Sequence, residues 1–470
     1  MLSNSTIRGN FYSDEALIWI NNLLSERFDV KDINVLRDKD FNFIIKHKEH
    51  ESYIQFPKTP SSLWDLNEEC PSSNVDLSEE NLNLPFDSQL PLPGYDSVDK
   101  LFTIEDGNCK FKADLLGIIY WILCRVEELN SDSLDRHGRF QFDYSHAYKH
   151  NYLMRPIVDE YLVIIGKIMD KIWSKNVRLN GEFKISVSHD VDAPAKYPQN
   201  NYFLIFRTFL VNLIKGNLNE CKLIYKILLS KNYLLSPYDA YNQFDWMMSR
   251  SEELGIKSTF YFICDKTSKI YDGDYKIRDE AIKNLIRSIY SRGHKLGVHF
   301  SYNSYNSVSA LKREIKVFKD FLQDEKIQQE EIGSRMHYLR WIFPDTSRNL
   351  SVAGTSYDAS VSYAGHPGFR AGTCFSYKAF DPIGCQEIDL EIRPLIAMEN
   401  SILSKRYMNI GFDKNPEDIF YRLIDSCENV GGTFSLLWHN SDLQFTEDRD
   451  LYTKILNYAS SKNNLQNEKN

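Results

Sequence analysis

The chain has 470 residues, of which 42% are hydrophobic and 13% aromatic, and it carries a formal net charge of −9 at pH 7. A chain of this length is longer than one ordinary domain requires, so we expect two domains. The negative charge argues against a general nucleic-acid-binding protein, because phosphate binding requires a basic surface.

The N-terminal segment lacks the basic stretch and apolar core of a secretory signal, so we do not expect export. The eight cysteines are scattered without a C-x-x-C pair, which is typical of buried thiols in a reducing compartment. No segment has the roughly 20 apolar residues that a transmembrane helix requires. We therefore expect a cytoplasmic protein without an integral membrane segment.

The first 180 residues combine helical and irregular patterns. Apolar spacing predicts helices over residues 15–24, 112–129 and 157–174. Residues 57–98 are rich in Pro, Ser, Asn and Asp, a composition that predicts a long irregular loop. Turn chemistry at Asn180-Gly181 marks the end of this region. We interpret residues 1–180 as an N-terminal accessory α+β domain.

From residue 181 onward, strand-like and helical patterns alternate. Apolar runs typical of strands cover residues 183–188, 258–263, 293–299, 335–340 and 434–440, and helices are predicted over 240–254, 279–292 and 308–324. This alternation predicts an α/β domain over residues 181–460, an incomplete or distorted (β/α) barrel with parallel strands. Residues 461–470 are predicted to form a polar tail.

The interval between the first strand and the first helix of this domain is long for a loop, so we expect an inserted helical element near residues 193–240. Within it, residues 202–215 are unusually apolar, although Arg207 and Asn212 interrupt the run. Three interpretations are open: a buried helix or lid over the site, an interfacial helix that contacts lipid-linked substrate, and an oligomer contact. No oligomeric state is predicted.

Two acidic residues, Asp190 and Asp192, directly follow the apolar run 183–188. The period of two along a strand places both carboxylates on one side of the strand end. Two like charges held this close repel each other, so a metal ion or a proton would stabilise the pair. Alternatively, the two acids only mark the turn at which the strand ends.

Three later strand-like runs end at His299, His337 and His439. In parallel α/β folds, the residues at the carboxyl ends of the strands converge on one site. Two carboxylates and three imidazoles at four such ends are typical of a metal-dependent hydrolase.

The order of these motifs resembles the polysaccharide deacetylase (NodB-type, carbohydrate esterase family 4) superfamily. The resemblance covers residues 182–445 and consists of Asp-x-Asp, Gly-His-x-x-Gly-x-His ending at His299, Arg335-x-x-Tyr338, and Trp438-His439. The N-terminal segments 116–121, 125–128 and 135–140 also resemble the accessory region of a bacterial branch of these proteins. The fold that this resemblance implies is a barrel of the polysaccharide deacetylase type.

The resemblance implies a role for each motif residue. Asp192 and His299 are expected to bind a divalent metal, zinc first, with cobalt, nickel or manganese as alternatives. A divalent metal lowers the pKa of bound water and polarises a carbonyl group, which hydrolysis of an unactivated amide requires. Asp190 is the expected catalytic base and His439 the expected general acid.

One position departs from the family pattern, because Asn303 stands where a second histidine ligand is usual. An amide oxygen binds zinc more weakly than an imidazole does. His337 stands where relatives usually have proline, so it is an alternative third ligand. Other roles for His337, as a pocket-lining or structural residue, are also open.

Further residues are assigned by the same resemblance. Arg335 is expected to pair with the catalytic base, and the backbone N–H of Tyr338 to bind the oxyanion. Asp358 is the expected carboxylate that orients His439, unless it only caps a helix.

The glycine-rich segment 365–374 is either a tight crossover or a substrate rim. We interpret it as a rim, because Arg370 could hold a phosphate or a carboxylate. The expected substrate contacts are Arg370, His366 and Trp438.

These assignments predict a metal-dependent hydrolase that removes an N-acyl group, most simply acetyl, from an amino sugar or glycan precursor in surface-polysaccharide synthesis. One alternative is a deformylase or another enzyme that hydrolyses non-peptide C–N bonds on the same barrel. Another is a catalytically inactive carbohydrate-binding relative, for which Asn303 is the main argument.

Overall fold

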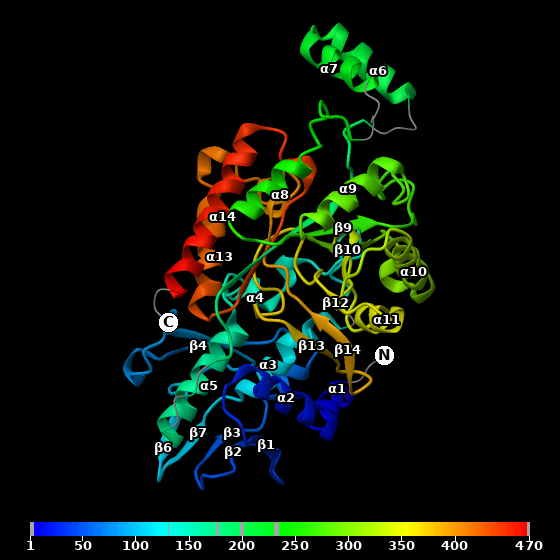
Figure 1. Ribbon diagram of the computed structural model, residues 1–470. Helices are drawn as coiled ribbons and strands as arrows, with labels where there is room; N and C mark the ends of the chain where they lie inside the picture. Colours follow the sequence, from blue (N-terminus) through cyan, green and yellow to red (C-terminus); the bar gives the residue numbers. More distant parts are fainter. Residues whose placement is uncertain are drawn as a thin grey trace.

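The computed structural model describes residues 4–129, 131–174, 177, 179–197, 202–229 and 235–467. These residues form a mixed α/β structure with sheets of nine, five and two strands. Figure 1 shows the five-stranded sheet at one end of the molecule and the helices α6 and α7 at the other.

The N-terminal region begins with two helices and a five-stranded sheet of order β1-β2-β3-β7-β6. Its strands are β1 (Ile33–Arg37), β2 (Phe43–His47), β3 (Tyr53–Phe56), β6 (Phe102–Glu105) and β7 (Asn108–Phe111), and its helices are α1 (Asn4–Phe11), α2 (Asp14–Arg27), α3 (Leu115–Leu123), α4 (His146–Lys149) and α5 (Ile157–Trp173). The side chain of Ser13 caps α2 by accepting a hydrogen bond from the Ala16 N–H. The three predicted helices are present, and the second is shorter than predicted.

The prediction of an irregular loop over residues 57–98 is wrong in part, because this segment contains a two-stranded antiparallel sheet. β4 (Ser72–Asp76) pairs with β5 (Gln89–Pro93). Prolines 91 and 93 lie in β5, and proline is tolerated in a strand only at an edge because it has no N–H to donate. A two-stranded sheet consists of edges alone, so a proline-rich segment can form it.

The large sheet has the order β13-β14-β12-β11-β10-β9-β8-β16-β15. Its strands are β8 (Lys184–Val191), β9 (Thr259–Ile263), β10 (Lys295–Phe300), β11 (Gly333–Met336), β12 (Tyr357–Asp358), β13 (Tyr377–Asp381), β14 (Gln386–Ile392), β15 (Ala397–Met398) and β16 (Thr433–Leu437). All neighbouring pairs are parallel except β13 with β14.

This sheet curls on itself. The segment 386–398 contains both β14 and β15, and it joins strand β12 on one side of the sheet to strand β16 on the other. Ile392 in β14 lies opposite Asp358 of β12, and Ala397 in β15 lies opposite Leu436 of β16. Between them, the Ile396 N–H donates to the Ser435 carbonyl oxygen. The arrangement agrees with the predicted distorted barrel.

Helices surround the curled sheet (Figure 1). They are α8 (Phe244–Glu253), α9 (Glu280–Ser291), α10 (Val308–Asp324), α11 (Asp345–Ala353), α12 (Glu399–Leu403), α13 (Glu417–Asn429) and α14 (Thr446–Asn467). Helix α14 continues through most of the predicted polar tail, whose residues 468–470 lie outside the described residues.

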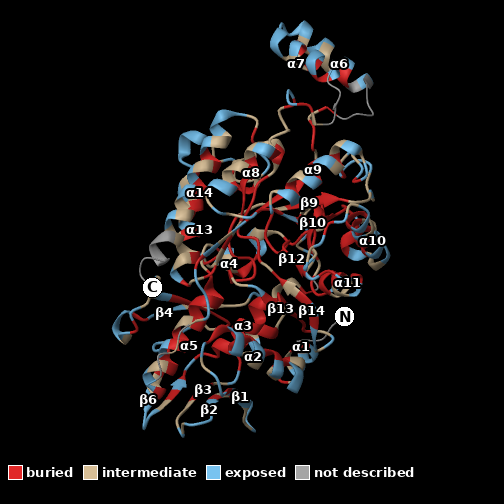
Figure 2. Ribbon diagram, in the orientation of Figure 1, coloured by how far each residue is buried: buried red, intermediate tan, exposed pale blue. Residues whose placement is uncertain are grey.

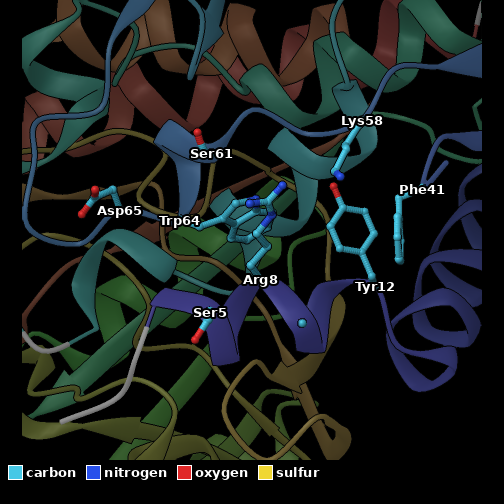
Figure 3. A pocket seen from close by; sticks show the side chains of 9 residues that line it. Ser5, Arg8, Tyr12, Phe41, Lys58, Ser61, Trp64 and Asp65 are labelled. Carbon is cyan, nitrogen blue, oxygen red and sulfur yellow. The ribbon is translucent and has the colours of Figure 1, made fainter.

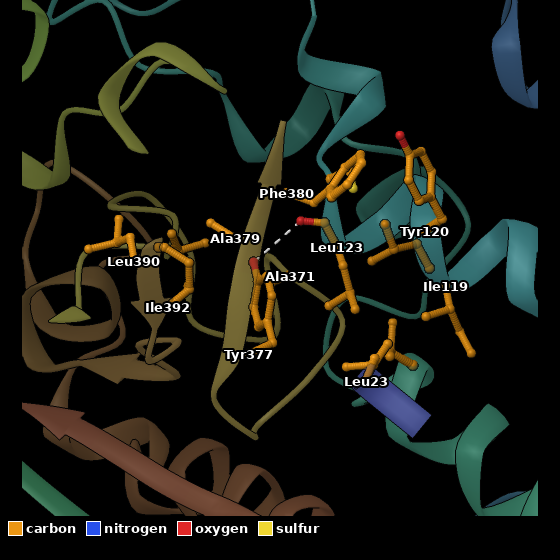
Figure 4. Close-up of a cluster of buried hydrophobic side chains, with 14 of the residues drawn as sticks. Leu23, Ile119, Tyr120, Leu123, Ala371, Tyr377, Ala379, Phe380, Leu390 and Ile392 are labelled. Atoms are coloured by element: carbon orange, nitrogen blue, oxygen red, sulfur yellow. Dashed lines mark hydrogen bonds between the residues drawn. The ribbon is translucent and has the colours of Figure 1, made fainter. Parts of the chain in front are cut away.

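The N-terminal region and the curled sheet share a hydrophobic core. The largest cluster of buried apolar side chains extends from Ile7 to Ile392, and Figure 2 shows buried residues on both sides of the predicted domain boundary. In Figure 4, side chains of α3 face β13, and the Tyr377 hydroxyl donates a hydrogen bond to the Leu123 carbonyl oxygen at 3.4 Å. The boundary near residue 180 stays a prediction.

The interval after β8 contains the helices α6 (Tyr202–Ile214) and α7 (Leu218–Leu229). They pack against each other through a small cluster that includes Ile205, Ile224 and Ile227. Their outer surfaces are exposed in Figure 2, and Ile214 is 85% exposed. The interpretation of residues 202–215 as a buried helix is therefore wrong. Across the described residues, no helix is both long and apolar enough to cross a membrane.

Candidate metal and catalytic site

The parallel strands bring together side chains that are up to 250 residues apart in the chain, roughly half its length. Asp190 lies one residue before the end of β8, and Asp192 directly follows that strand. His299 lies one residue before the end of β10. His337 follows β11, and His439 lies two residues after β16. These four strands lie close together in the sheet. All five side chains line one pocket, as their positions at strand ends predicted.

Asp192, His299 and His337 are placed as metal ligands would be. The His299 Nε2 atom lies 3.0 Å from Asp192 Oδ1, and His337 Nε2 lies 3.5 Å from Asp192 Oδ2. The potential ligand atoms of the three side chains all lie within 4.8 Å of one another.

The outer nitrogens of both imidazoles have hydrogen-bond partners. His299 Nδ1 lies 3.0 Å from the Arg335 carbonyl oxygen, which can only accept, so this nitrogen carries the proton. His337 Nδ1 lies 2.9 Å from a carboxylate oxygen of Asp272. Metal-binding histidines commonly make such contacts, which orient the ring and leave Nε2 free to bind the ion.

The donor set fits a cation. With its proton on Nδ1, His299 presents Nε2 to Asp192 Oδ1, and both atoms are buried without a hydrogen-bond partner in the described structure. Two acceptors 3.0 Å apart repel each other unless a metal ion or a proton lies between them. One carboxylate and two imidazoles with open positions are typical of a catalytic zinc site.

The charges of this cluster reinforce one another. Burial alone would raise the pKa of Asp192, but His337 and His299 hold it well below its usual value. Burial would lower the pKa of His337, but Asp192 and Asp272 raise it to about 9. The site therefore favours an ionised carboxylate beside positive charge.

Asp272 is a site residue that the sequence analysis missed. It is 6% exposed and accepts hydrogen bonds from the backbone N–H groups of Thr267, Ser268 and Tyr302, which fix its position. Its surroundings in the chain, an acidic and glycine-containing loop, are those of an ordinary turn. No local signal indicated its contact with His337.

The expected acid, His439, is oriented by Glu399. Its Nδ1 atom lies 2.5 Å from Glu399 Oε1, and its Nε2 atom lies 3.6 Å from Asp192 Oδ2. Burial would lower the pKa of His439, but Glu399, with Asp192 and Asp190, raises it well above the usual value. Glu399 therefore orients the His439 ring and favours its protonated form.

The predicted orienting role of Asp358 is wrong. Asp358 lies in β12 and accepts hydrogen bonds from the Ser334 hydroxyl at 2.7 Å and the Ser360 N–H at 2.7 Å. Burial raises its pKa to about 6. Its carboxylate therefore stabilises the neighbouring strand and loop, whereas Glu399, at the start of α12, contacts His439.

The predicted pairing of Arg335 with Asp190 is also not found. The guanidinium group donates a hydrogen bond to the Ser188 hydroxyl at 2.8 Å and lies 5.1 Å from the centre of the Tyr261 ring. In the described part of the chain, Asp190 forms no ion pair with arginine, and its Oδ1 atom is buried without a hydrogen-bond partner. Arg335 is directed into the barrel interior because it alternates along β11 with the residues that face outward.

Tyr338 lies in a strained turn at the pocket wall. Tyr338 and Leu339 have φ values of 63° and 54°, which are uncommon for residues other than glycine. The Tyr338 carbonyl oxygen accepts a hydrogen bond from Arg139 Nη1 at 2.8 Å. Such strain persists at functional sites where surrounding contacts maintain it.

Asn303 does not lie with the three potential ligands. Its side chain is exposed, its Oδ1 atom accepts from Arg340 at 3.2 Å, and its Nδ2 atom donates to the Thr267 carbonyl oxygen at 3.1 Å. Of the two alternatives for the third ligand, the geometry favours His337.

The pocket has a volume of about 380 Å³, within the range of small-molecule sites. Its apolar walls are formed by Leu339, Ala364, Met398 and Leu437, and its further polar lining residues are Arg139, Asn400, Ser404, Arg406 and Tyr407. Arg139 comes from the N-terminal region, so that region contributes to the pocket.

The three predicted substrate contacts are not found in this pocket. Trp438 is completely buried in the core, where its Nε1 atom donates to the Asp442 carbonyl oxygen. Arg370 is 3% exposed and forms an ion pair with Glu128 at 2.5 Å. His366 is half-buried and packs against Phe142. The predicted roles of Trp438 and Arg370 are wrong, since burial prevents the first and an ion pair occupies the second.

The segment 365–374 is a structural crossover, and none of its residues lines the pocket around Asp192. The Gly368 N–H donates to the Ile396 carbonyl oxygen, and the Gly372 carbonyl oxygen accepts from the Val158 N–H. Gly372 has a φ of +63°, and a Cβ atom there would lie 2.7 Å from Ile122 Cγ2. The glycines therefore allow this loop to pack tightly against the N-terminal region.

Another cavity, of about 620 Å³, lies between α1 and the segment 58–65 (Figure 3). It is lined by Ser5, Arg8, Gly9, Tyr12, Phe41, Lys58, Ser61, Trp64 and Asp65. This lining contains no histidine or cysteine and a single carboxylate, so it offers no metal-binding set. The potential metal ligands Asp192, His299 and His337 instead line the pocket described above.

Comparison with known proteins adds one family and several solved structures. Residues 13–174 match a family of unknown function (DUF7033). No curated protein matches this chain.

Several solved structures are similar over 60% of this chain, including the following three. A protein from Mycobacterium smegmatis assigned as a polysaccharide deacetylase is 11% identical, with a TM-score of 0.38 over 85% of its length. The Puue allantoinase is 12% identical, with a TM-score of 0.36 over 85% of its length. The chitin deacetylase of the fungal pathogen Colletotrichum lindemuthianum is 11% identical, with a TM-score of 0.28 over 83% of its length. Likenesses of this degree carry no argument about the chemistry of this chain.

Proposed function

We propose that this protein is a metal-dependent hydrolase that removes an N-acyl group, most simply acetyl, from an amino sugar. The observation that carries the proposal is the pair of buried acceptors, His299 Nε2 and Asp192 Oδ1, 3.0 Å apart. They lie in one pocket with Asp190 and with a histidine that is oriented by a glutamate.

Asp192, His299 and His337 would hold the metal, and zinc suits this donor set best. When bound, such an ion lowers the pKa of a water molecule and polarises the acyl carbonyl group. The ordered sequence motifs of residues 182–445 support the same assignment.

The remaining steps belong to the side chains of the protein. Asp190 Oδ1, buried and without a hydrogen-bond partner in the described structure, accepts the proton of the attacking water. His439 Nε2 donates a proton to the leaving nitrogen, while Glu399 Oε1 holds the Nδ1 proton. The apolar walls at Leu339, Met398 and Leu437 exclude other water from the reacting atoms.

The proposal is tested by metal analysis and by turnover. Protein purified without chelators is expected to contain about one divalent ion per chain, and to release acetate from a panel of N-acetylated amino sugars. Asp190→Asn is expected to keep the metal and lose turnover, because the amide is nearly isosteric but cannot accept the proton.

The same assay separates the alternatives. Release of formate alone from formamido sugars would assign the protein as a deformylase. Sugar binding without release of either acid, by metal-loaded protein, would assign it as a binding protein and overturn the proposal.

A further inference from the structure

A cavity other than that of Figure 3, named the second cavity below, adjoins the active-site pocket. Half of the residues that line it belong to the N-terminal region. The second cavity has a volume of about 580 Å³. The residues that line both spaces are Arg139, Leu339, Ala364, Arg406 and Tyr407. Much of its remaining lining comes from the segment 134–142. A substrate held in the active-site pocket can therefore extend into this second cavity.

The second cavity has an excess of positive charge. Its lining includes four arginines and a single carboxylate, that of Asp135. Two of the arginines are neutralised by ion pairs, Arg139 with Asp135 and Arg370 with Glu128. Arg136 and Arg406 are exposed, and in the described structure neither guanidinium group forms an ion pair, while Arg136 Nε donates a hydrogen bond to His137 Nε2 at 3.1 Å.

Arg406 borders both spaces, and Arg136 lines the second cavity, so a group attached to the sugar that extends into this cavity would meet both arginines. Paired guanidinium groups bind phosphate oxygens well, since their planar N–H groups match the geometry of the anion. Gln141, Tyr363 and Tyr407 provide further hydrogen-bonding groups nearby.

We propose, resting on the hydrolase function above, that the substrate is an amino sugar carrying a phosphate or diphosphate ester, and that Arg136 and Arg406 bind this group. The cavity is larger than one phosphate requires, so it also admits the first part of a nucleoside or a polyprenyl chain. The N-terminal region thereby determines which amino sugars are substrates.

The kinetic test compares an N-acetylhexosamine with its 1-phosphate, its nucleoside diphosphate ester and its short-chain polyprenyl diphosphate ester. Arg406→Gln and Arg136→Gln are each expected to lower the ratio of kcat/KM for phosphorylated over unphosphorylated sugar by about tenfold, as loss of a charged hydrogen bond predicts. Arg422→Gln changes an exposed arginine of α13 that lines neither cavity, and it is the matched control. An unchanged ratio in both cavity variants would refute the proposal.

A binding test separates this proposal from the hydrolase function. Titration calorimetry of the full chain with inorganic pyrophosphate is expected to show binding that Arg136→Gln and Arg406→Gln weaken about tenfold and Arg422→Gln does not. If this holds without acyl release from any sugar, the phosphate site stands and the hydrolase function fails. If the protein releases the acyl group, but neither arginine substitution changes pyrophosphate binding, the phosphate site is wrong and the hydrolase function stands.

A different observation concerns the helices α6 and α7, which project from the body of the molecule (Figure 1). Ten large apolar side chains on them are exposed: Phe203, Phe206, Leu210, Val211, Leu213, Ile214, Leu218, Tyr225, Leu228 and Leu229. Apolar surface of this extent marks an interaction site on a folded protein.

The charge of these helices differs from that of the whole chain. Residues 202–229 contain four basic residues and one acidic residue, Glu220, a net charge of +3, whereas the whole chain has −9. Glu220 is itself paired with Lys196 at 2.9 Å. Exposed apolar side chains combined with basic residues are typical of helices that lie on an anionic membrane surface.

We infer that α6 and α7 bind the surface of an anionic phospholipid bilayer. With 13 residues, α6 is too short to cross a bilayer, which requires roughly 20. The two helices are the next elements in the chain after β8, whose carboxyl end carries the candidate site. Membrane contact would keep that edge near lipid-linked molecules.

The test is co-sedimentation of the full chain with vesicles of phosphatidylcholine alone and of phosphatidylcholine with phosphatidylglycerol. Binding is expected only to the anionic vesicles, and to fall about tenfold or more in Phe206→Ser/Ile214→Ser and in Lys222→Glu/Lys226→Glu. Exposed apolar Val352, on α11, provides the matched control Val352→Ser. The inference would be overturned if the wild type bound no vesicles but formed dimers at high concentration. Loss of these dimers in Phe206→Ser/Ile214→Ser would then identify the helices as a site of self-association.

Discussion

Replacing Glu399 with glutamine separates the charge of this residue from its shape. Glutamine keeps an oxygen close to His439 Nδ1, where the glutamate oxygen lies at 2.5 Å, but removes the negative charge. Glu399 is the main cause of the raised pKa of His439, and burial acts in the opposite direction. In the variant, the pKa of His439 should therefore fall toward its usual value.

The magnitude follows from the protonated fraction of the acid. An imidazole with the usual pKa of about 6.5 is about 3% protonated at pH 8, whereas a pKa well above this keeps most of it protonated. If His439 must donate a proton, kcat of Glu399→Gln should fall about 30-fold at pH 8. At pH 6, where the usual imidazole is mostly protonated, the loss should be severalfold at most.

The assay is acid release as a function of pH, followed for the wild type and the variant with the same metal content. The alkaline limb of kcat should move to lower pH in Glu399→Gln. Glu160→Gln removes another buried glutamate, which lies in α5 outside the pocket and pairs with Arg155, and should keep the wild-type profile. An equal loss of kcat at all pH values in Glu399→Gln would refute the role of the charge and leave only a structural one.

Three further predictions concern the metal and stability. His299→Ala should lose bound metal, as measured by plasma mass spectrometry. His294→Ala removes a histidine that is hydrogen-bonded to the Ser258 N–H and to Glu252, and it should retain the metal. Equal metal content in both variants would contradict the ligand assignment. His337→Ala should weaken zinc binding by tenfold or more in a chelator competition, and Asn303→Ala should not; the reverse order would identify the amide as the ligand. Burial raises the pKa of Glu314 to about 7, so its contribution to stability is present below the usual pKa and lost as pH rises through 7. The free energy of unfolding of Glu314→Gln relative to wild type should therefore rise by about 3 kcal/mol between pH 4.5 and 8 in urea titrations, and a constant difference would show that this carboxyl does not titrate with folding.

Contacts between distant segments were the part of the site that could not be predicted. Glu399 contacts His439 across 40 residues, and Asp272 contacts His337 across 65. Both carboxylates lie in segments whose local sequence is that of an ordinary loop or helix start. Their roles arise only because the curled sheet places β15 beside β16, and the loop after β9 beside the end of β11.

Burial was likewise decided by the tertiary structure. Trp438 and Arg370 have the composition of substrate contacts, yet one lies in the core and the other is neutralised by Glu128. Conversely, the apolar pattern of residues 202–214 is equally compatible with a buried helix, and the structure leaves it exposed. An apolar segment shows that it requires a partner, but the packing of the remaining chain determines whether a partner is present.

The sequence by itself determined the strand ends that carry Asp190, Asp192, His299 and His439. Alternation and the change from apolar run to polar loop are local properties, and parallel strands place their carboxyl ends at one edge. The tertiary structure alone decided which carboxylate orients the acid, which side chain supplies the third potential ligand, and that Arg139 of the N-terminal region reaches the pocket. These depend on how segments far apart in the chain pack against one another, and packing is set by the shape and charge of all of them together.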